Sequence, residues 1–457
     1  MLSKKSFLVI IGVYVCVVSF MGLFFWGCKG AQLEETSSVN TTVAETTAQK
    51  TEAVTETSSE IITLRYPHWF FGHGGSFEEW INGAVDAFEA ENPNIRVERE
   101  QVPFDIYWDK LSTSIAGGNP PDVAAFGPVQ LGKFISAGSL LPLNDLINME
   151  DVNLNFSSLQ KESIPSAAPD GKTYGLAFDS GFYLPLYRPS VFKEAGIEKY
   201  ANTPEEFIEM TKKLTGKGKY GYAFMVKPGN YTEAYIDYVI WTIGLGGHFG
   251  TNDGKPALNS PEVIKAMSYL KQLFDAKVIP LDTDKGTYRE MFATKAVATI
   301  IDGMWMYGLS IGWDPSAEGD FMTAPLPFPT QRVAGFYECN SVMAGSKYPK
   351  EAAKLVEYLS NTEQQERLVR ICQLIPPRTS VFTDQLKSEL IEQWPWYKEF
   401  INHADNAILF VPPAMDMGKV EEVTRIWNIY MERILFENAD VTITMNNAQD
   451  EAMKLFK

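Results

Sequence analysis

Short apolar runs alternate with amphipathic segments along the chain from residue 61 onward. Residues 61–66, IITLRY, predict a strand, and residues 77–88 carry apolar side chains at helical spacing behind a predicted capping box of Ser76 and Glu79. Residues 95–102 and 123–126 predict two further strands, with a helix between them. Strands that alternate with helices predict an α/β fold with mainly parallel sheets flanked by helices.

The stretch PHWFFGHG, residues 67–74, follows the first predicted strand directly. Ligands of such sheets bind outside the carboxyl ends of the strands, so this position favours an open aromatic platform with Trp69 and His68 as ligand-binding residues. Phe70 and Phe71 suit the core equally well. A metal site would need more ligands than His68 and His73, so we expect no metal and no cofactor.

The N-terminus differs in composition from the rest. MLSKKS precedes an almost wholly apolar run that ends at Cys28. This order predicts a signal peptide over residues 1–27 and resembles a bacterial lipobox with Cys28 as the lipid-modified (acylated, for example palmitoylated) residue, although Phe25 and Trp26 depart from that pattern. An uncleaved anchor is the alternative, since about 20 apolar residues span a bilayer. Both place the body outside the cytoplasmic membrane, on the periplasmic face or the cell surface.

Residues 28–60 are rich in Thr, Ser and Glu and contain no aromatic residue, which predicts a disordered tether. The whole chain of 457 residues has a net charge of −17, which argues against nucleic acid as a partner. Outside the N-terminal segment the cysteines are Cys339 and Cys372. These two could pair in an oxidising compartment or remain free and buried.

Several segments, in this order, resemble a known family. They read LSTSIAGGNPPDVAAF, SAGSLLPLNDLI, GKTYGLAF, TPEEFIEMTKKL, FATKAVATIIDGMW and EAAKLVEYLSNTEQQERL. The chain resembles the extracellular solute-binding proteins of ABC importers, specifically the sugar-binding, maltose-type family. The resemblance implies a periplasmic-binding-protein-like fold of two lobes with a hinge between them. Lobe one would be residues 61–177 with 327–375, and lobe two residues 180–325 with 377–457.

The resemblance also implies a ligand and partners. The ligand would be a mono- or oligosaccharide held between the lobes, the partner the transmembrane subunits of an ABC permease, and the protein a monomer attached to the membrane by its lipid. A sugar ring needs aromatic platforms for its apolar face and polar side chains for its hydroxyls. Drying about 50 Å² of ring yields only about 1 kcal/mol, whereas micromolar affinity requires about 8 kcal/mol, so several residues must converge.

Position and resemblance together give further ligand-binding candidates. They are Trp305, Asp302, Phe126, Gln130, Asp179, Tyr231, Trp241, Tyr337, Glu338 and Asp416. Trp241 lies on an apolar helix and suits the core as well. Arg188 stands where the family usually has Asn, and it either has a structural role or alters the polar surroundings of the ligand.

Other function classes stay open on the residues alone. Aromatic clefts with paired carboxylates also serve glycoside hydrolases, but no such pair is identifiable, so we expect no enzyme. A binding protein for a peptide, polyamine or organic anion is the main alternative, and a surface adhesin or sensory protein is a further one.

Overall fold

The computed structural model divides the chain into residues 1–58 and one compact unit of residues 59–457. It describes residues 60–72, 74–229, 234–412 and 415–457. The predicted signal peptide (1–27), Cys28 and almost all of the predicted tether (28–60) therefore lie outside the described residues, as do His73 and Tyr231.

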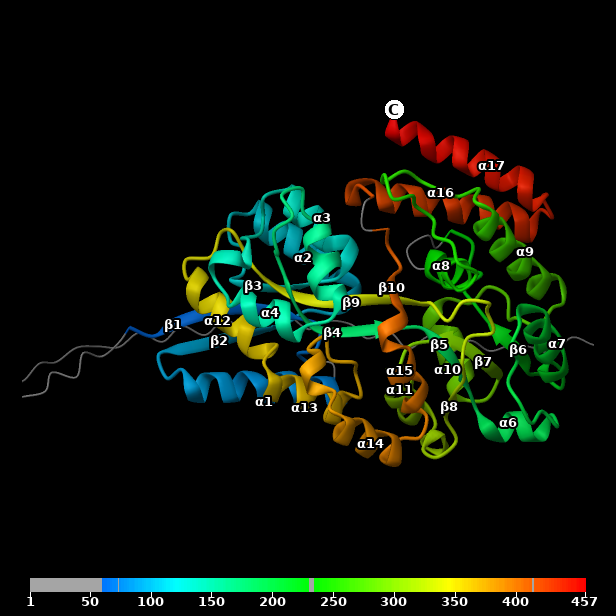
Figure 1. Ribbon diagram of the computed structural model, residues 1–457, viewed down its shortest axis with the longest axis horizontal. Helices are drawn as coiled ribbons and strands as arrows, with labels where there is room; N and C mark the ends of the chain where they lie inside the picture. Colours follow the sequence, from blue (N-terminus) through cyan, green and yellow to red (C-terminus); the bar gives the residue numbers. More distant parts are fainter. Residues whose placement is uncertain (1–59, 73, 230–233, 413–414) are drawn as a thin grey trace, which may run out of the picture. The chain divides into compact units, whose positions relative to one another are not determined.

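The described elements form two groups (Figure 1). The first is built around two sheets, β1-β2 and β10-β9-β3 with β4 paired to β9, and the second around a single sheet. The strands of the first group are β1 (Ile62–His68), β2 (Ile95–Gln101), β3 (Val123–Phe126), β4 (Leu176–Phe182), β9 (Val333–Val342) and β10 (Ala407–Leu409). β1 pairs with β2 in parallel, and β9 pairs with β3, β4 and β10. The predicted strands at 95–102 and 123–126 are confirmed to within a residue.

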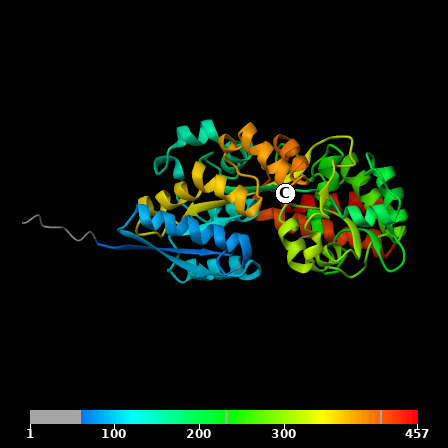
Figure 2. The same cartoon turned by 90° about the horizontal axis from the view of Figure 1, so that it is seen from below.

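Helices cover the first group. They are α1 (Gly75–Glu91), α2 (Phe104–Ala116), α3 (Pro128–Ser136), α4 (Met149–Asn155), α5 (Ile164–Ser166), α12 (Pro349–Leu359) and α13 (Thr362–Cys372). The buried face of α1 includes Trp80, Val85 and Phe88, as the periodicity predicts. α1 packs against α12 and α13, and Figures 1 and 2 both show α1 beside α12.

The start of α1 corrects one prediction. The N-cap is Gly74, and no side chain caps the helix, so the capping box of Ser76 and Glu79 does not form. Instead, the backbone N–H of Gly74 donates to Glu78 Oε2 at 2.8 Å. The glycines at 74 and 75 have φ values of 81° and 64°, a backbone that starts the helix before Ser76.

The second group is built around β5 (Leu184–Tyr187), β6 (Tyr220–Ala223), β7 (Val297–Asp302) and β8 (Met322–Thr323), in the order β6-β7-β5-β8. Its helices are α6 (Pro189–Glu194), α7 (Pro204–Leu214), α8 (Ala234–Gly244), α9 (Pro261–Asp275), α10 (Lys285–Ala293) and α11 (Met306–Trp313). The remaining helices are α14 (Asp384–Gln393), α15 (Tyr397–His403), α16 (Met417–Phe436) and α17 (Val441–Ala452). α16 and α17 pack against each other and against α9, and α16 also contacts α3 of the first group.

The two-lobed α/β prediction is confirmed, but the expectation of mainly parallel sheets is wrong. β9 runs antiparallel to β3 and β4, and β5 runs antiparallel to β7 and β8. The reason is that the chain passes between the groups along extended segments. β4 continues after Tyr183 into β5, and the chain returns from β8 to β9.

The two cysteines of the body are both free and buried. The Cys372 thiol donates to the Ser76 carbonyl at 3.3 Å, while Cys339 lies in β9 against Gly175, where a Cβ would come within 2.4 Å of its sulfur. Of the two alternatives, the structure shows the free, buried state. Burial raises the pKa of both thiols, so neither is a reactive thiolate.

None of the helices in the described ranges combines the length and the apolar character that crossing a bilayer requires.

Candidate functional site

The antiparallel ribbon of β4 and β9 carries the candidate site. Its register places Asp179 opposite Glu338 and Gly181 opposite Phe336. Because side chains alternate between the faces of a strand, Phe336 and Glu338 lie on one face of β9, and the residues opposite them share that face. The ribbon thus presents an aromatic ring and two carboxyl groups together.

Asp179 and Glu338 are neighbouring acidic residues on this face. Asp179 is 5% exposed, and its Oδ1 accepts a hydrogen bond from the backbone N–H of Glu338 at 3.1 Å. Burial raises the pKa of Asp179 to about 8, and burial together with the neighbouring Asp179 raises the pKa of Glu338 well above its usual range. Such a pair holds at least one proton at neutral pH, so it can both donate and accept hydrogen bonds.

Three aromatic residues meet beside this face. Trp305 follows β7, and its ring lies 5.5 Å from that of Phe336 and 5.6 Å from that of Tyr183. We name Tyr183, Trp305 and Phe336 the crossing-strand aromatic cluster. Trp305 and Phe336 are partly exposed, whereas Tyr183 is buried. The cluster therefore offers ring surface to solvent next to the carboxyl pair.

Two glycines make room for these rings. A Cβ at Gly303 would lie 2.0 Å from the Trp305 ring, and a Cβ at Gly181 would lie 2.6 Å from the Phe336 ring. Real Cβ atoms do not approach other atoms so closely, so any larger residue at either position would displace the cluster.

Asp302 lies under the cluster but does not face outward. It is fully buried, and Arg289 holds both of its oxygens, with Nε to Oδ2 at 2.7 Å and Nη2 to Oδ1 at 2.9 Å. The backbone N–H of Gly303 also donates to Oδ1, at 2.8 Å. Its carboxylate is occupied by the protein and fixes the turn that carries Trp305, and a contact of Asp302 with the ligand stays a prediction.

The opening loop lies in the core. His68 is 0% exposed and Trp69 is 7% exposed. The His68 ring lies 4.4 Å from that of Trp69 and 5.3 Å from that of Phe178, and Trp69 in turn lies edge-on to Tyr107 at 5.0 Å. Burial lowers the pKa of His68 to about 3, so the ring is neutral. These contacts correct the prediction of an open platform, because α1 and α2 supply aromatic partners that enclose the loop.

Three further candidates are also core residues in this structure. Phe126, Trp241 and Tyr337 are each 0% exposed. Phe126 packs on Phe134 at 5.1 Å, and Trp241 Nε1 donates to the Tyr222 hydroxyl at 3.3 Å. Tyr337 alternates with its neighbours in β9 and so points to the face opposite Phe336.

The last two described candidates lie on elements other than the ribbon. Gln130 is partly exposed on α3. Asp416 is exposed and caps α16, where its Oδ1 accepts from the backbone N–H of Gly418 at 3.0 Å. Of the predicted residues, the structure thus brings together Asp179, Glu338 and Trp305, with Asp302 behind them.

Sequence reasoning missed Phe336, Tyr183 and Arg289. Alternation along GFYECN could have assigned Phe336 to the face of Glu338, because the two are two positions apart in a strand. No sequence signal marks Tyr183 or Arg289, since their roles depend on contacts between distant segments.

Arg188 has a structural role. Its side chain is fully buried, and its Nη1 donates to the Ala293 carbonyl. It also forms ion pairs with Asp314 at 3.4 Å and Asp320 at 3.3 Å. The guanidinium therefore ties together β5, α10 and the segment after α11. Its hydrogen-bond and ion-pair partners in the described ranges do not include a candidate ligand-binding residue.

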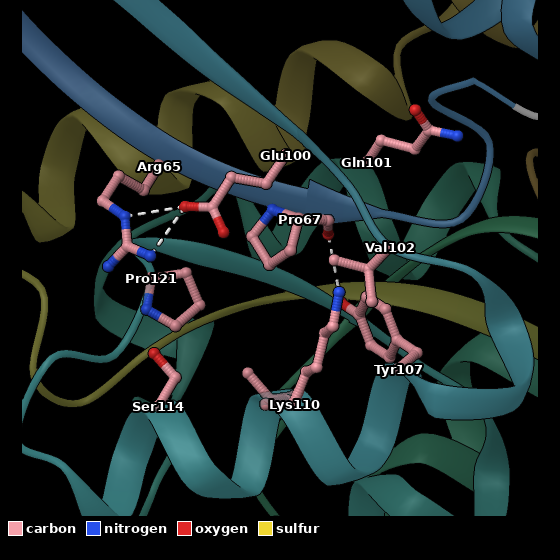
Figure 3. A pocket seen from close by; sticks show the side chains of 10 residues that line it. Arg65, Pro67, Glu100, Gln101, Val102, Tyr107, Lys110, Ser114 and Pro121 are labelled. Carbon is pink, nitrogen blue, oxygen red and sulfur yellow. Dashed lines mark hydrogen bonds and ion pairs between the residues drawn. The ribbon is translucent and has the colours of Figure 1, made fainter. Parts of the chain in front are cut away.

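A separate cavity of about 220 Å³ lies between β1, β2 and α2 (Figure 3). Arg65 and Glu100 form an ion pair at 2.7 Å on its strand side, and Lys110 and Ser114 of α2 face them. The buried Tyr107 hydroxyl donates to the Pro67 carbonyl at 3.1 Å. Because its buried polar groups already bond one another, this cavity is a weaker candidate than the ribbon face.

The described part of the chain holds no cluster of three or more His, Cys, Asp or Glu side chains arranged for a metal ion.

Comparison with known proteins identifies relatives. A family model described as bacterial extracellular solute-binding protein matches residues 83–397. A binding protein of Brucella abortus (strain 2308) is 31% identical over 204 residues, which are 44% of this chain and 47% of that protein, so the match spans about half of its length. The diacetylchitobiose binding protein of Streptomyces coelicolor is 26% identical over 318 residues, 67% of this chain and 72% of that protein.

A solved structure shares the fold. The ABC transporter solute-binding protein from Thermotoga lettingae, bound with α-D-tagatose, gives a TM-score of 0.74 at 23% identity, over 87% of this chain and 100% of that one. Because the family model covers more than half of its length, this chain belongs to the bacterial extracellular solute-binding protein family.

Proposed function

We propose that the protein captures a sugar or oligosaccharide on the ribbon face and delivers it to an ABC permease. The observation that carries this proposal is the convergence of partly exposed Trp305 and Phe336 with the carboxyl groups of Asp179 and Glu338. The rings suit the apolar face of a sugar, and the carboxyl pair suits its hydroxyls. The sugar ligands named for the Streptomyces and Thermotoga relatives support the same class.

The lobes would close on the ligand by a hinge. Residues 61–177 with 327–375 would form one lobe, and residues 180–325 with 377–457 the other. The continuous passage from β4 into β5 supports a hinge near Tyr183, because few residues connect the two sheets there. The ligand would then be bound without chemical change, by a monomer.

Attachment to the membrane belongs to the same proposal. Acylation of Cys28 would anchor the protein outside the cytoplasmic membrane, and residues 28–60 would let the body reach the permease at a high effective concentration. Replacing Cys28 by Ala should move the protein from the membrane fraction to the soluble fraction of the producing bacterium, provided the signal is still cleaved. Unchanged membrane association of Cys28→Ala would favour the uncleaved apolar anchor instead.

Ligand-dependent thermal unfolding tests the function. The purified protein is heated with neutral sugars, including N,N′-diacetylchitobiose and D-tagatose, and with amino acids, peptides and polyamines. Ligand at about 100 times its dissociation constant should stabilise the protein by about 2.7 kcal/mol. A rise in melting temperature with sugars alone supports the proposal, whereas a rise only with peptides or amines would replace the sugar by another solute class.

A further inference from the structure

Lys285 and Arg289 lie four residues apart on α10 and so project from the same side of that helix. Lys285 is 4% exposed, yet no described residue accepts a hydrogen bond from its Nζ. The nearest carboxylate oxygen, Asp237 Oδ1, is 3.8 Å away. A buried ammonium group carries three donors, and leaving them without acceptors costs free energy. Among the described residues, Lys285 Nζ is therefore left with donors for a further acceptor.

Both cations border the crossing-strand aromatic cluster. Lys285 Nζ lies 5.8 Å from the centre of the Tyr183 ring, and the guanidinium carbon of Arg289 lies 5.8 Å from the Trp305 ring. The two rings are in edge-on contact with each other. A molecule bound at this cluster would thus lie close to two cationic side chains.

Arg289 also has one donor nitrogen without an acceptor among the described residues. Its Nε and Nη2 bond Asp302, but Nη1 has no acceptor among the described residues. The side chain is 21% exposed, and Nη1 is not one of the fully buried polar atoms that lack a partner. The ion pair with Asp302 holds the guanidinium in place and leaves Nη1 for a ligand.

The charges of this region already balance. The negative charge of Asp302 is paired with the positive charge of Arg289, and that of Asp237 with Lys285. Asp237 also accepts a hydrogen bond from the Met225 backbone N–H at 2.9 Å. An acidic ligand would add a negative charge beside two buried carboxylates with no cation left to neutralise it. The balance therefore favours an uncharged ligand with many acceptor oxygens.

We propose that Lys285 Nζ and Arg289 Nη1 form the donor side of the binding site and bond hydroxyl or ring oxygens of an uncharged saccharide stacked on Trp305. This inference rests on the proposed function and narrows it. The ribbon face of Asp179 and Glu338 bonds the hydroxyl groups at the other edge of the sugar. Acidic sugars are excluded as the preferred ligands.

The test compares two variants by isothermal titration with each neutral sugar that shifts the melting temperature. Lys285→Met with Asp237→Asn removes the donors and one carboxylate together, so no unpaired charge is left. Arg289→Lys keeps a cation for Asp302 but removes Nη1. Each variant should bind the sugar at least tenfold more weakly. The ligand-free melting temperature reports whether each variant is folded. If Lys285→Met/Asp237→Asn does not fold, Arg289→Lys tests the proposal.

Lys227→Met is the matched control, because Lys227 is 43% exposed and pairs with Asp284 on the surface. Its sugar affinity should equal that of the wild type. Unchanged affinity in both Lys285→Met/Asp237→Asn and Arg289→Lys overturns the inference and leaves the proposed function intact, as does tighter wild-type binding of D-glucuronate than of D-glucose. Failure of every sugar to bind the wild type removes the proposed function, and the inference with it.

Discussion

Two aromatic segments follow strand ends in this protein, and they differ in their exposure to solvent. Trp69–Phe71, after β1, are enclosed and at most 7% exposed, whereas Trp305, after β7, keeps part of its ring in solvent. The difference lies in their neighbours. The first segment is covered by Phe77 and Trp80 of α1 and by the aromatic residues of α2. The neighbours of Trp305 instead include the small or polar residues Gly181, Gly303 and Arg289 of α10. Aromatic residues after a strand become a binding surface only where the next helices do not cover them.

The largest expected effect is on stability, in the enclosed segment. Phe70→Ala should lower the free energy of unfolding by about 3–5 kcal/mol, because the ring stacks on Phe77 at 4.7 Å and its loss leaves a cavity. Urea unfolding followed by fluorescence measures the change. Sugar affinity of the folded protein should stay the same. A loss below about 1 kcal/mol would mean that the loop opens in solution, and the contrast between the segments would disappear.

Trp305→Ala should lower the sugar affinity and leave the stability nearly unchanged, the reverse of Phe70→Ala. Removing a partly exposed stacking residue should weaken sugar binding by about 2 kcal/mol, about 30-fold, while the free energy of unfolding changes by less than about 1 kcal/mol. Titration calorimetry and urea unfolding of the same preparation separate the two quantities. Unaltered affinity would show that Trp305 is a packing residue like Trp69.

A smaller effect is the pH dependence of the free energy of unfolding. The contributions of the two regions change with pH in opposite directions. The pKa of Asp179 is raised to about 8 from 3.8, so the folded state keeps a proton that the unfolded state loses, and this contribution to stability falls as pH rises through that interval. The pKa of His68 is lowered from 6.5 to about 3, so its contribution falls as pH drops below 6.5.

Of these groups, only the carboxyl pair of Asp179 and Glu338 titrates between pH 6.5 and 8. Asp179→Asn should therefore flatten a decline of about 1.5 kcal/mol in the free energy of unfolding over this range, since one proton contributes at most about 1.4 kcal/mol per pH unit. Urea unfolding at the two pH values measures it. The same slope in wild type and variant would mean that the proton responsible for the decline is not on Asp179.

Local patterns predicted the local features of this fold well. The strand at Val123–Phe126 and the buried face of α1 follow from alternation and helical spacing. The antiparallel pairing of β4 with β9 joins segments more than 150 residues apart, and the choice of Phe336 over Tyr337 depends on that register. Likewise, nothing in the sequence near Trp69 shows that Tyr107 and Phe178 will enclose it. Long-range pairing decided these outcomes.

The most direct measurement is a crystal structure of the protein in complex with the neutral sugar that raises its melting temperature most. We expect a sugar ring stacked on Trp305 and Phe336, with hydroxyls on Asp179 or Glu338 and oxygens within hydrogen-bond distance of Lys285 and Arg289. A sugar bound instead in the cavity between Arg65 and Lys110, or against Trp69 in an opened loop, would contradict it.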